Sequence, residues 1–316
     1  DFRGTLAAKS MTTLTVGRDF RAAKVLLGAD LGLDARLGGT ELNADTFSNG
    51  NITTIAGNGT AGFIGDGGLG TLASLNLPRG VAVDGSGNVF VADQANHRLR
   101  VLPAAGGGFI TTIAGNGTSG FSGDGGPPAS ARLASPAGVA VDSAGNIYVA
   151  DSNNHRIRKI SAATGLISTA AGNGFAGFSG DGGAATSASL FNPLDIAVDS
   201  AGDLYIADQF NRRIRKVTMA TGVITTVVGN GSLGFSGDGG LATNAALSSA
   251  IGVTVDGAGN IYVADQVNQR VRKVTVATGI ITTVAGNGSA GFSGDGGAAT
   301  SAALSNPDRK STRLNS

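Results

Sequence analysis

Five glycine-rich loops hold the residues of this chain whose types and spacing suit ligand chemistry. Residues 115–126 read GNGTSGFSGDGG, and near copies stand at residues 58–68, 172–183, 229–240 and 286–297. Successive backbone amides in such loops can hold a phosphate, usually at a helix N-terminus and with a Lys or Arg close by. These loops contain no Lys, and no GKS or GKT follows them. The sequence therefore does not favour a phosphate site.

The Asp of each GDGG is the residue in these loops that suits a metal ion. Carboxylate, amide and hydroxyl oxygens are ligands of the kind that calcium takes, but calcium needs about six to eight of them. With one Asp per loop, carbonyl groups and water would have to supply most of the remaining calcium ligands. We expect no cofactor and keep calcium as an alternative. Its candidate ligands are Asp66, Asp124, Asp181, Asp238 and Asp295.

A structural role for the loops is the third interpretation, and the sequence favours it. Each loop has a Phe in its middle, and we expect this ring to be buried and to offset part of the entropy cost of ordering so much glycine. The five rings belong to Phe63, Phe121, Phe178, Phe235 and Phe292. The loops then act as caps that fold back on neighbouring strands.

The two histidines of the chain, His97 and His155, occupy equivalent positions in successive repeats, where Arg212 and Gln269 replace them later. A catalytic zinc ion takes about three protein ligands, so this pair does not favour a zinc site. The chain has no Cys, which excludes thiolate metal sites and disulfides. No Ser-His-Asp set and no carboxylate pair stands out from the repeat background.

A repeat of about 57 residues must position these groups, because the GDGG aspartates are spaced by 58, 57, 57 and 57 residues. One copy shows period-two alternation in four short apolar stretches, bounded by Gly, Asn and Asp, which is typical of half-buried antiparallel strands. These stretches are residues 138–142, 146–151, 155–160 and 165–172. A lone four-stranded sheet, here called a blade, exposes two apolar faces and must stack on a neighbour. The fold class is all-β, a β-propeller, with a stacked solenoid as the alternative. A short helical turn is expected at residues 184–190, with Leu190 pinned to the blade.

An Asp follows the second strand of each blade, and an Arg stands five residues later. We expect the Asp to accept backbone amides in the tight connection to the third strand and to pair with that Arg. The aspartates are Asp93, Asp151, Asp208 and Asp265, and the arginines are Arg98, Arg156, Arg213 and Arg270. A second Asp, such as Asp84 or Asp142, precedes a Gly that is placed for a hairpin turn. Both patterns recur in every blade and predict turn structure, not catalysis.

The stretch GVAVDSAGNIYVADSNNHRIRKI resembles the NHL repeat, whose tripeptide reads Asn154-His155-Arg156 here. The inserted FSGDGG resembles the longer blades of bacterial NHL proteins and of the teneurin NHL propeller. The resemblance implies a propeller that usually has six blades. Some relatives hold zinc with histidines near the axis, and lactonase-like propellers use acidic channel ligands. No Glu lies in the blades, since Glu41 is the only one in the chain.

We divide the chain into three parts. Residues 1–50, with the leucine-rich stretch at 24–39, are unassigned; residues 51–307 form the propeller repeats; and residues 308–316 are expected to be non-native. That last segment, DRKSTRLNS, resembles a translated sequencing adapter. Four full blades and a remnant strand at 51–57, whose first three strands are missing, predict an incomplete ring with exposed blade faces.

Charge and hydropathy disfavour a nucleic-acid partner and indicate no membrane span. The formal net charge is +1, and without the four charged residues of the last segment 20 basic residues stand against 21 acidic ones. A neutral chain does not favour nucleic acid, although an Arg and Lys row on each third strand is expected to be exposed. The chain contains no apolar run of about 18 or more residues, which is the length that would predict a membrane span.

These patterns favour a non-enzymatic binding scaffold for protein or glycan partners, bacterial in type and placed outside the cytoplasm. The alternative is a lyase-like or lactonase-like propeller enzyme whose metal ligands lie partly in missing blades. Partner contacts are expected where the blades differ, on the connection between second and third strands. The predicted contact residues are Gln94, Asn153, Gln209, Phe210, Gln266 and Val267.

Overall fold

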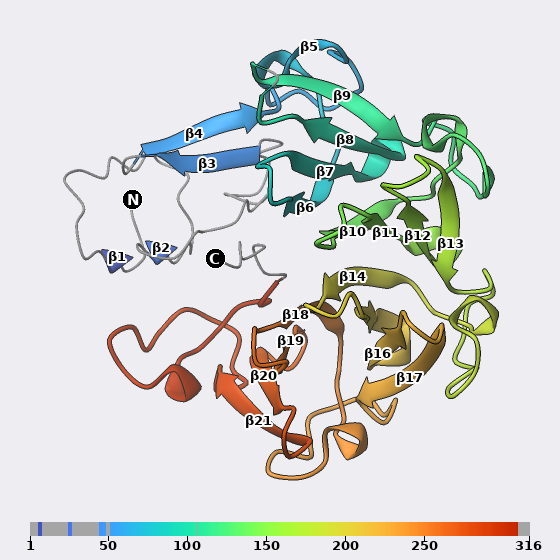
Figure 1. The fold of residues 1–316 in the computed structure, drawn as a ribbon. Helices are drawn as coiled ribbons and strands as arrows, with labels where there is room; N and C mark the ends of the chain where they lie inside the picture. Colours follow the sequence, from blue (N-terminus) through green and yellow to red (C-terminus); the bar gives the residue numbers. More distant parts are fainter. Residues whose placement is uncertain (1–5, 8–24, 27–43, 49–50, 106, 309–316) are drawn as a thin grey trace. The chain divides into compact units, whose positions relative to one another are not determined.

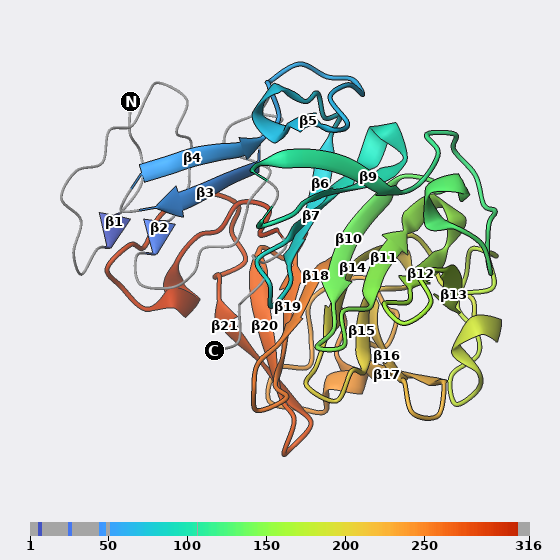
Figure 2. The same ribbon diagram turned by 45° about the horizontal axis from the view of Figure 1, so that its top comes forward.

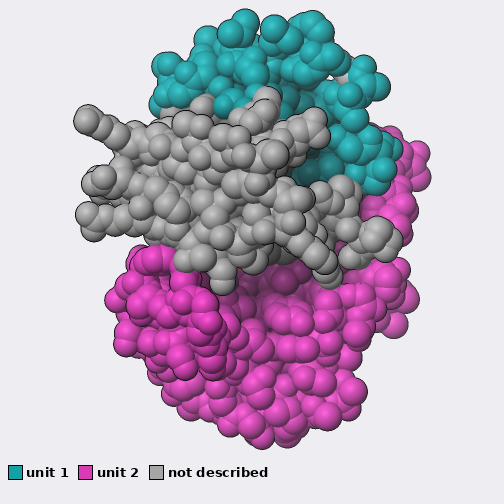
Figure 3. Space-filling model, turned by 90° about the vertical axis from the view of Figure 1, so that its left-hand side faces the viewer, with its two compact units in different colours: residues 1–122, 127–139, 311–316 teal, residues 123–126, 140–310 magenta. Residues whose placement is uncertain are grey.

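The computed structural model describes residues 6–7, 25–26, 44–48, 51–105 and 107–308. They divide into two compact units, of which the first holds the described residues up to Ser122 together with Pro127–Val139 (Figure 3). The second holds Gly123–Gly126 and the described residues from Ala140 onward. Glu41, most of the stretch at 24–39 and the segment from residue 309 lie outside the described residues.

Each complete repeat forms an antiparallel sheet whose four strands follow one another in the chain (Figure 1). Figure 2 shows the same succession of strands from a second direction. Blade 1 comprises β6 (Pro78–Val83), β7 (Val89–Asp93), β8 (Arg98–Leu102) and β9 (Phe109–Ala114), and β5 (Gly68–Leu69) pairs with β9. Blade 2 comprises β10 (Pro136–Val141), β11 (Ile147–Asp151), β12 (Arg156–Ile160) and β13 (Ile167–Ala171). The predicted blade is confirmed.

The later two blades lie within the second unit. Blade 3 comprises β14 (Pro193–Val198), β15 (Leu204–Asp208), β16 (Arg213–Thr218) and β17 (Val223–Val228). Blade 4 comprises β18 (Ala250–Val255), β19 (Ile261–Asp265), β20 (Arg270–Thr275) and β21 (Ile280–Ala285). Blades 3 and 4 share one apolar core, in which Ile214 and Val228 pack with Val253 and Val263. Stacking of one sheet on the next is what buries the two apolar faces that a single blade exposes.

A register shift interrupts the pairing of the third and fourth strands of every blade. In blade 3 the partners change from Ile214 with Val228 to Arg215 with Thr226, which leaves one extra residue on β17. The same shift occurs at Arg100, Arg158 and Arg272. A bulge of this kind increases local twist and re-aims the neighbouring side chains.

The remnant before blade 1 has two strands, whereas the sequence predicted one. β3 (Ala44–Ser48) pairs antiparallel with β4 (Asn51–Ala56), and the register shifts between Ala44 and Asp45. This is the pairing pattern of third and fourth strands in the complete blades. The third strand of the remnant is therefore present, and it escaped prediction because ADTFS lacks the Arg-rich pattern of its counterparts. A further short pair, β1 (Leu6–Ala7) and β2 (Val25–Leu26), is parallel.

The helices of the described residues are single 3-10 turns in two sets. Those after the GDGG loops were predicted, and Leu190 behind η5 is fully buried as expected. They are η1 (Gly70–Leu72), η3 (Pro128–Ser130), η5 (Ala185–Ser187), η7 (Ala242–Asn244) and η8 (Ala299–Ser301). The second set lies between the second and third strands: η2 (Gln94–Asn96), η4 (Ser152–Asn154) and η6 (Gln209–Asn211).

Candidate functional site

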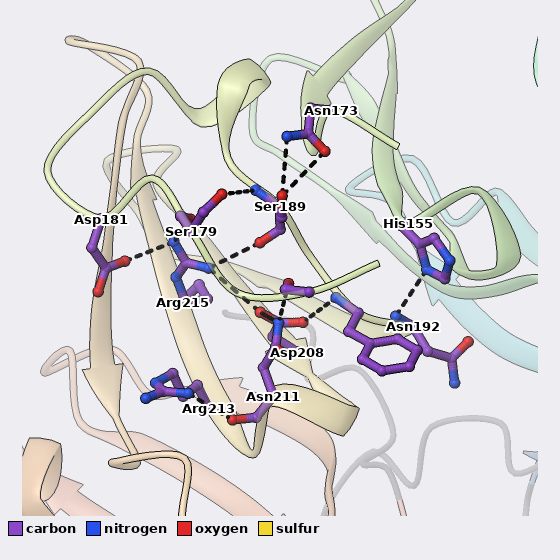
Figure 4. A network of polar contacts seen from close by, with 12 residues as sticks. His155, Asn173, Ser179, Asp181, Ser189, Asn192, Asp208, Asn211, Arg213 and Arg215 are labelled. Atoms are coloured by element: carbon purple, nitrogen blue, oxygen red, sulfur yellow. Dashed lines mark hydrogen bonds and ion pairs between the residues drawn. The ribbon is translucent and has the colours of Figure 1, made fainter. Parts of the chain in front are cut away.

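A buried arginine on the third strand of each blade lies between two aspartates. In blade 3 the guanidinium of Arg215 lies 2.7 Å from Asp181 of the preceding GDGG loop and 3.5 Å from Asp208 (Figure 4). Arg215 and Asp208 are fully buried, and 37% of the Asp181 side chain is exposed. The other three sets are Arg100 with Asp66 and Asp93, Arg158 with Asp124 and Asp151, and Arg272 with Asp238 and Asp265. Each of the four GDGG loops that precede a complete blade is thus fastened to that blade.

These ion pairs bear on the calcium alternative. Four of the five candidate carboxylates bind a guanidinium at 2.6 to 2.7 Å. Among the described residues no group of three or more His, Cys, Asp or Glu is placed to hold a metal ion. The repeat chemistry of the loop is therefore an ion pair between loop and blade.

In blade 3 the second aspartate accepts a side chain of the turn, but its backbone donor stands before the first strand and not, as predicted, in the connection to the third strand. The Asp208 carboxylate accepts the Phe191 N–H at 2.7 Å and the Asn211 side-chain amide at 2.8 Å. Burial raises the pKa of Asp208 to about 6, because the cost of removing the charge from water exceeds the stabilisation by these donors and by Arg215. Burial also raises the pKa of Asp93 and Asp265.

The predicted partner of this aspartate was wrong. Asp208 pairs with Arg215, not with Arg213, which donates to the carbonyl oxygens of Asn211 and Asn230 at 3.0 and 2.7 Å. Arg98, Arg156 and Arg270 make the same two backbone contacts in their blades. The carboxylates go to the deeper arginine because a buried guanidinium without a counter-charge costs far more than a half-buried one.

Two expectations about exposure were also wrong. The loop phenylalanines are 36% to 50% exposed, not buried. The Phe178 ring lies 3.7 Å from the Arg213 guanidinium and 4.8 Å from that of Arg215, so cation–π contact orders the loop. The Arg and Lys row is not an exposed surface either, because Arg100, Arg158, Arg215 and Arg272 are fully buried.

In blades 1, 2 and 4 the middle residue of the NHL tripeptide accepts a backbone N–H from the segment that leads out of the following glycine-rich loop. The Nδ1 atom of His155 accepts the Asn192 N–H at 3.2 Å, and that of His97 accepts the Ser135 N–H at 3.1 Å. In blade 4 the Oε1 atom of Gln269 takes this place, 2.6 Å from the Asn306 N–H. Burial lowers the pKa of both histidines. These side chains serve as backbone acceptors in the described structure.

The hairpin prediction for the first two strands is confirmed. Asp142 accepts the backbone N–H groups of Ala144 and Asn146 at 3.0 and 2.8 Å, and Gly145 takes φ 81°. The positive φ explains the Gly at this turn.

The predicted contact residues all lie between the second and third strands of their blades. Phe210 and Val267 are 50% and 61% exposed, and Asn153 is exposed as well, whereas Gln94 and Gln266 are half-buried. Gln209 has a structural role: its Oε1 atom accepts the Asn192 side-chain amide at 2.7 Å, and its Nε2 atom donates to the Ser249 hydroxyl at 3.3 Å.

Two further phenylalanines of blade 3 were missed. Phe191 packs edge-on against Phe210 with ring centroids 4.9 Å apart, and His155 packs against Phe191 at 5.7 Å. Phe175 is 75% exposed, and its neighbour Ala176 bridges to Leu190, next to Phe191. We call Phe175, Phe191 and Phe210 the blade 3 phenylalanine patch.

A comparison of the repeats position by position would have found this patch. At the position of Phe175 the other repeats have Thr60, Thr118, Ser232 and Ser289. At the position of Phe191 they have Asn76, Ala134, Ser248 and Ser305, and at that of Phe210 they have Ala95, Asn153 and Val267. One repeat thus has three exposed Phe where the others have smaller residues.

Asp195 is a second feature of blade 3 that was missed. It stands in β14, where the equivalent residues are Gly80, Gly138 and Gly252. The side chain is buried, and its Oδ2 atom accepts the Val253 N–H of blade 4 at 3.0 Å. This carboxylate ties the first strands of two blades together.

Comparisons with known proteins agree with this architecture. The NHL repeat family matches residues 75–102 and 133–160, and the Teneurin NHL domain family matches residues 174–236. Protein SUPPRESSOR OF QUENCHING 1, chloroplastic, of Arabidopsis thaliana is 30% identical over 230 residues, 70% of this chain and 22% of that protein. Teneurin-1 of Mus musculus is 31% identical over 237 residues, 67% of this chain and 8% of that protein. The chain therefore spans less than a quarter of the length of either relative.

A solved structure supports the fold independently of these relatives. An auxiliary nutrient binding protein from Bacteroides thetaiotaomicron is 16% identical, with a TM-score of 0.59 over 89% of this chain and 63% of that chain. In the described part of the chain, no helix has the length and apolar character that crossing a membrane requires. The recurring sheets, the tripeptide at each blade junction and these matches identify the chain as an NHL-repeat protein built of β-propeller blades.

Proposed function

We propose that this chain is a non-enzymatic binding module and that a protein partner docks on blade 3, with Phe191 and Phe210 as its anchors. The observation that carries the proposal is the blade 3 phenylalanine patch. Its three rings are 36% to 75% exposed at positions where the other repeats have smaller residues. The sibling blades adopt the same sheet without them, so the fold does not require these rings.

Aromatic side chains clustered on a surface are typical of protein interfaces, where buried rings supply much of the binding free energy. An exposed apolar cluster is otherwise a liability, because water is a poor solvent for it. A face that keeps the Phe191–Phe210 ring pair exposed, with Phe175 exposed in the loop before the blade, is best explained by a partner that covers these rings.

The patch is also held in place before any partner binds. Asp208 accepts the Phe191 N–H, and Gln209 accepts the side-chain amide of Asn192 at 2.7 Å. Phe210 follows Gln209 in η6, and the Phe210 N–H donates to the Phe191 carbonyl at 3.2 Å. A preorganised surface loses less conformational entropy on binding.

The charges beside the patch indicate what the partner should carry. Asp208 is fully buried and paired, whereas Arg212 is half-buried and occupies the position that His155 has in blade 2. A partner with apolar anchors and an acidic rim would complement this face. A glycan partner would depend on side-chain amides beside the patch and on stacking against a single ring, and not on the Phe191–Phe210 pair.

The test uses residues that the sibling blades already tolerate. The triple variant Phe175→Thr, Phe191→Ser and Phe210→Asn carries residues found at these positions in the other repeats. All proteins are made in a bacterial host without N-linked glycosylation, so that Phe175→Thr cannot add a glycan at Asn173. The matched control is Val267→Asn, which removes an exposed apolar residue from the same position in blade 4. Each protein, immobilised, is exposed to extract of the source organism, and captured proteins are cross-linked and mapped by mass spectrometry.

We expect captured proteins to cross-link near blade 3 with wild type and with Val267→Asn, and to be lost with the triple variant. Circular dichroism should show the same melting midpoint for all three. Undiminished capture by a folded triple variant would refute the blade 3 surface. The alternative, an enzyme with metal ligands in further blades, predicts activity of a longer chain that survives the triple substitution.

A further inference from the structure

Four of the five glycine-rich loops carry the triplet Asn-Gly-Ser or Asn-Gly-Thr, which the ion-pair role of these loops leaves unexplained. The triplets begin at Asn58, Asn116, Asn230 and Asn287, and all four asparagines are exposed. In the fifth loop Asn173 is followed by Gly174 and Phe175, so the hydroxyl residue is missing. Asn-x-Ser/Thr with a residue other than Pro in the middle is the acceptor pattern for N-linked glycans.

The asparagine side chain closes a turn in each loop. The Oδ1 atom of Asn58 accepts the Thr60 N–H at 2.9 Å, and the same bond joins Asn116 to Thr118, Asn230 to Ser232 and Asn287 to Ser289. Asn173 makes this bond to Phe175 at 2.9 Å as well. The turn uses the backbone N–H of the third residue and not its side chain, so the turn itself does not call for Ser or Thr.

The side-chain amide has a second contact that a glycan would not destroy. The Nδ2 atom of Asn58 donates to the Leu72 carbonyl at 3.1 Å, and the other three donate to Ser130, Asn244 and Ser301 at 3.4, 2.9 and 3.0 Å. An unmodified amide has two N–H groups, and glycosylation replaces one of them. The remaining N–H can keep this bond. Beside Asn58 the space is open, since a Cβ atom added at Gly59 would have no neighbour within 4 Å, whereas at Gly117, Gly231 and Gly288 it would meet the guanidinium of Arg98, Arg213 and Arg270, respectively.

The structure assigns N-linked glycan acceptor sites to Asn58, Asn116, Asn230 and Asn287. The co-reactant is an oligosaccharide activated as a lipid diphosphate. A bond forms between Nδ2 and C1 of the first sugar, the C1–O bond to the diphosphate breaks, and one Nδ2 proton is lost to solvent. This assignment stands apart from the binding proposal for blade 3 and agrees with the extracytoplasmic location expected from the sequence.

The experiment secretes the full chain, behind a signal sequence, from a eukaryotic host that makes N-linked glycans. Asn51 begins a further triplet, Asn-Ile-Thr, in β4. It is replaced by Gln in every protein, so that any glycan detected belongs to an asparagine of the loops. Intact mass before and after peptide N-glycosidase, with peptide mapping, gives the occupancy of each asparagine. We expect glycan on Asn58, Asn116, Asn230 and Asn287 and an unmodified Asn173.

Two variants separate acceptor chemistry from structure. Thr60→Ala should abolish modification of Asn58 and leave the melting midpoint unchanged, because the turn needs only the backbone N–H of residue 60. Phe175→Thr should add a fifth modified site at Asn173, whose turn already has the same geometry. Secreted, folded protein without glycan on the four asparagines would overturn the assignment, as would equal modification of Asn173 in the wild type.

Discussion

Arg158 and Asp124 lie 2.7 Å apart although 34 residues separate them in the chain. The loop that carries Asp124 precedes blade 2, and Arg158 stands in the third strand of that blade. Every complete blade repeats this contact, so an ion pair fastens the glycine-rich loop before each complete blade to the third strand of that blade.

Removing either of the two carboxylates beside Arg215 should lower the free energy of unfolding, and the two losses should differ in size. Asp181→Asn is expected to lower the free energy of unfolding by about 1 kcal/mol, because water replaces part of the contact of a side chain that is 37% exposed. Asp208→Ala should cost about 3 kcal/mol or more, since it removes the buried carboxylate beside the Arg215 guanidinium and the acceptor of the Phe191 N–H and the Asn211 amide. Urea unfolding followed by circular dichroism measures both, as the chain has no Trp. Equal losses would contradict the difference in burial.

The histidine links should make stability depend on pH. Burial lowers the pKa of His97 and His155 from the ordinary value of 6.5, so the unfolded state binds protons first as the pH falls. Their contribution is present above pH 6.5 and is lost as the pH falls through the lowered folded-state pKa. We expect the free energy of unfolding to fall over that window in urea titrations.

The double variant His97→Gln and His155→Gln is the control for this pH dependence. Gln269 accepts the equivalent N–H in blade 4, so Gln should preserve the link without titrating. The buried Asp208 acts in the opposite sense: its raised pKa makes its contribution fall as the pH rises from 3.8 to about 6. Only the difference between wild type and double variant isolates the histidines. An unchanged pH profile in the double variant would contradict the assignment.

Two glycines of one loop should respond differently to Ala. Gly180 and Gly182 both take φ 81°, which costs an L-residue about 1 kcal/mol. A Cβ atom at Gly180 would lie 2.7 Å from Ala188, whereas one at Gly182 would have no neighbour within 4 Å. Gly180→Ala should therefore lower the melting midpoint well beyond Gly182→Ala in thermal unfolding. Similar midpoints would mean that the loop does not pack on η5 as described.

Asp195 should matter as a hydrogen-bond acceptor. Asp195→Leu leaves the buried Val253 N–H without this acceptor, which is expected to cost about 1 to 3 kcal/mol. Asp195→Asn retains a side-chain carbonyl and should cost much less. Chemical unfolding of the two variants compares their free energies of unfolding. A larger loss of stability in Asp195→Asn than in Asp195→Leu would contradict the acceptor role and indicate that the negative charge is what matters.

Sequence alone determined the blade, its four strands, the hairpin at Asp142 and the 3-10 turn before Leu190. Each of these depends on local signals: period-two alternation, a Gly that must take positive φ, and an Asp two residues before a turn amide. Such features are visible in a single repeat, and repetition strengthened them. The acceptor role of Asp208 beside Asn211 was predictable for the same reason, but its backbone donor, Phe191, stands 17 residues earlier in the chain and was not.

Tertiary structure decided which side chains meet. Asp208 has two arginines within reach on β16, and the bulge beside Arg215, together with burial of that side chain, selects Arg215. Phe178 stays half-exposed although the guanidinium groups of Arg213 and Arg215 lie over its ring. Phe191 and Phe210 form a pair because Asp208, at the start of the turn that contains Phe210, accepts the backbone N–H of Phe191 and so holds the two residues close together. These contacts depend on which side chains burial and the bulge bring together within a blade and its loop, and the local sequence pattern does not specify that.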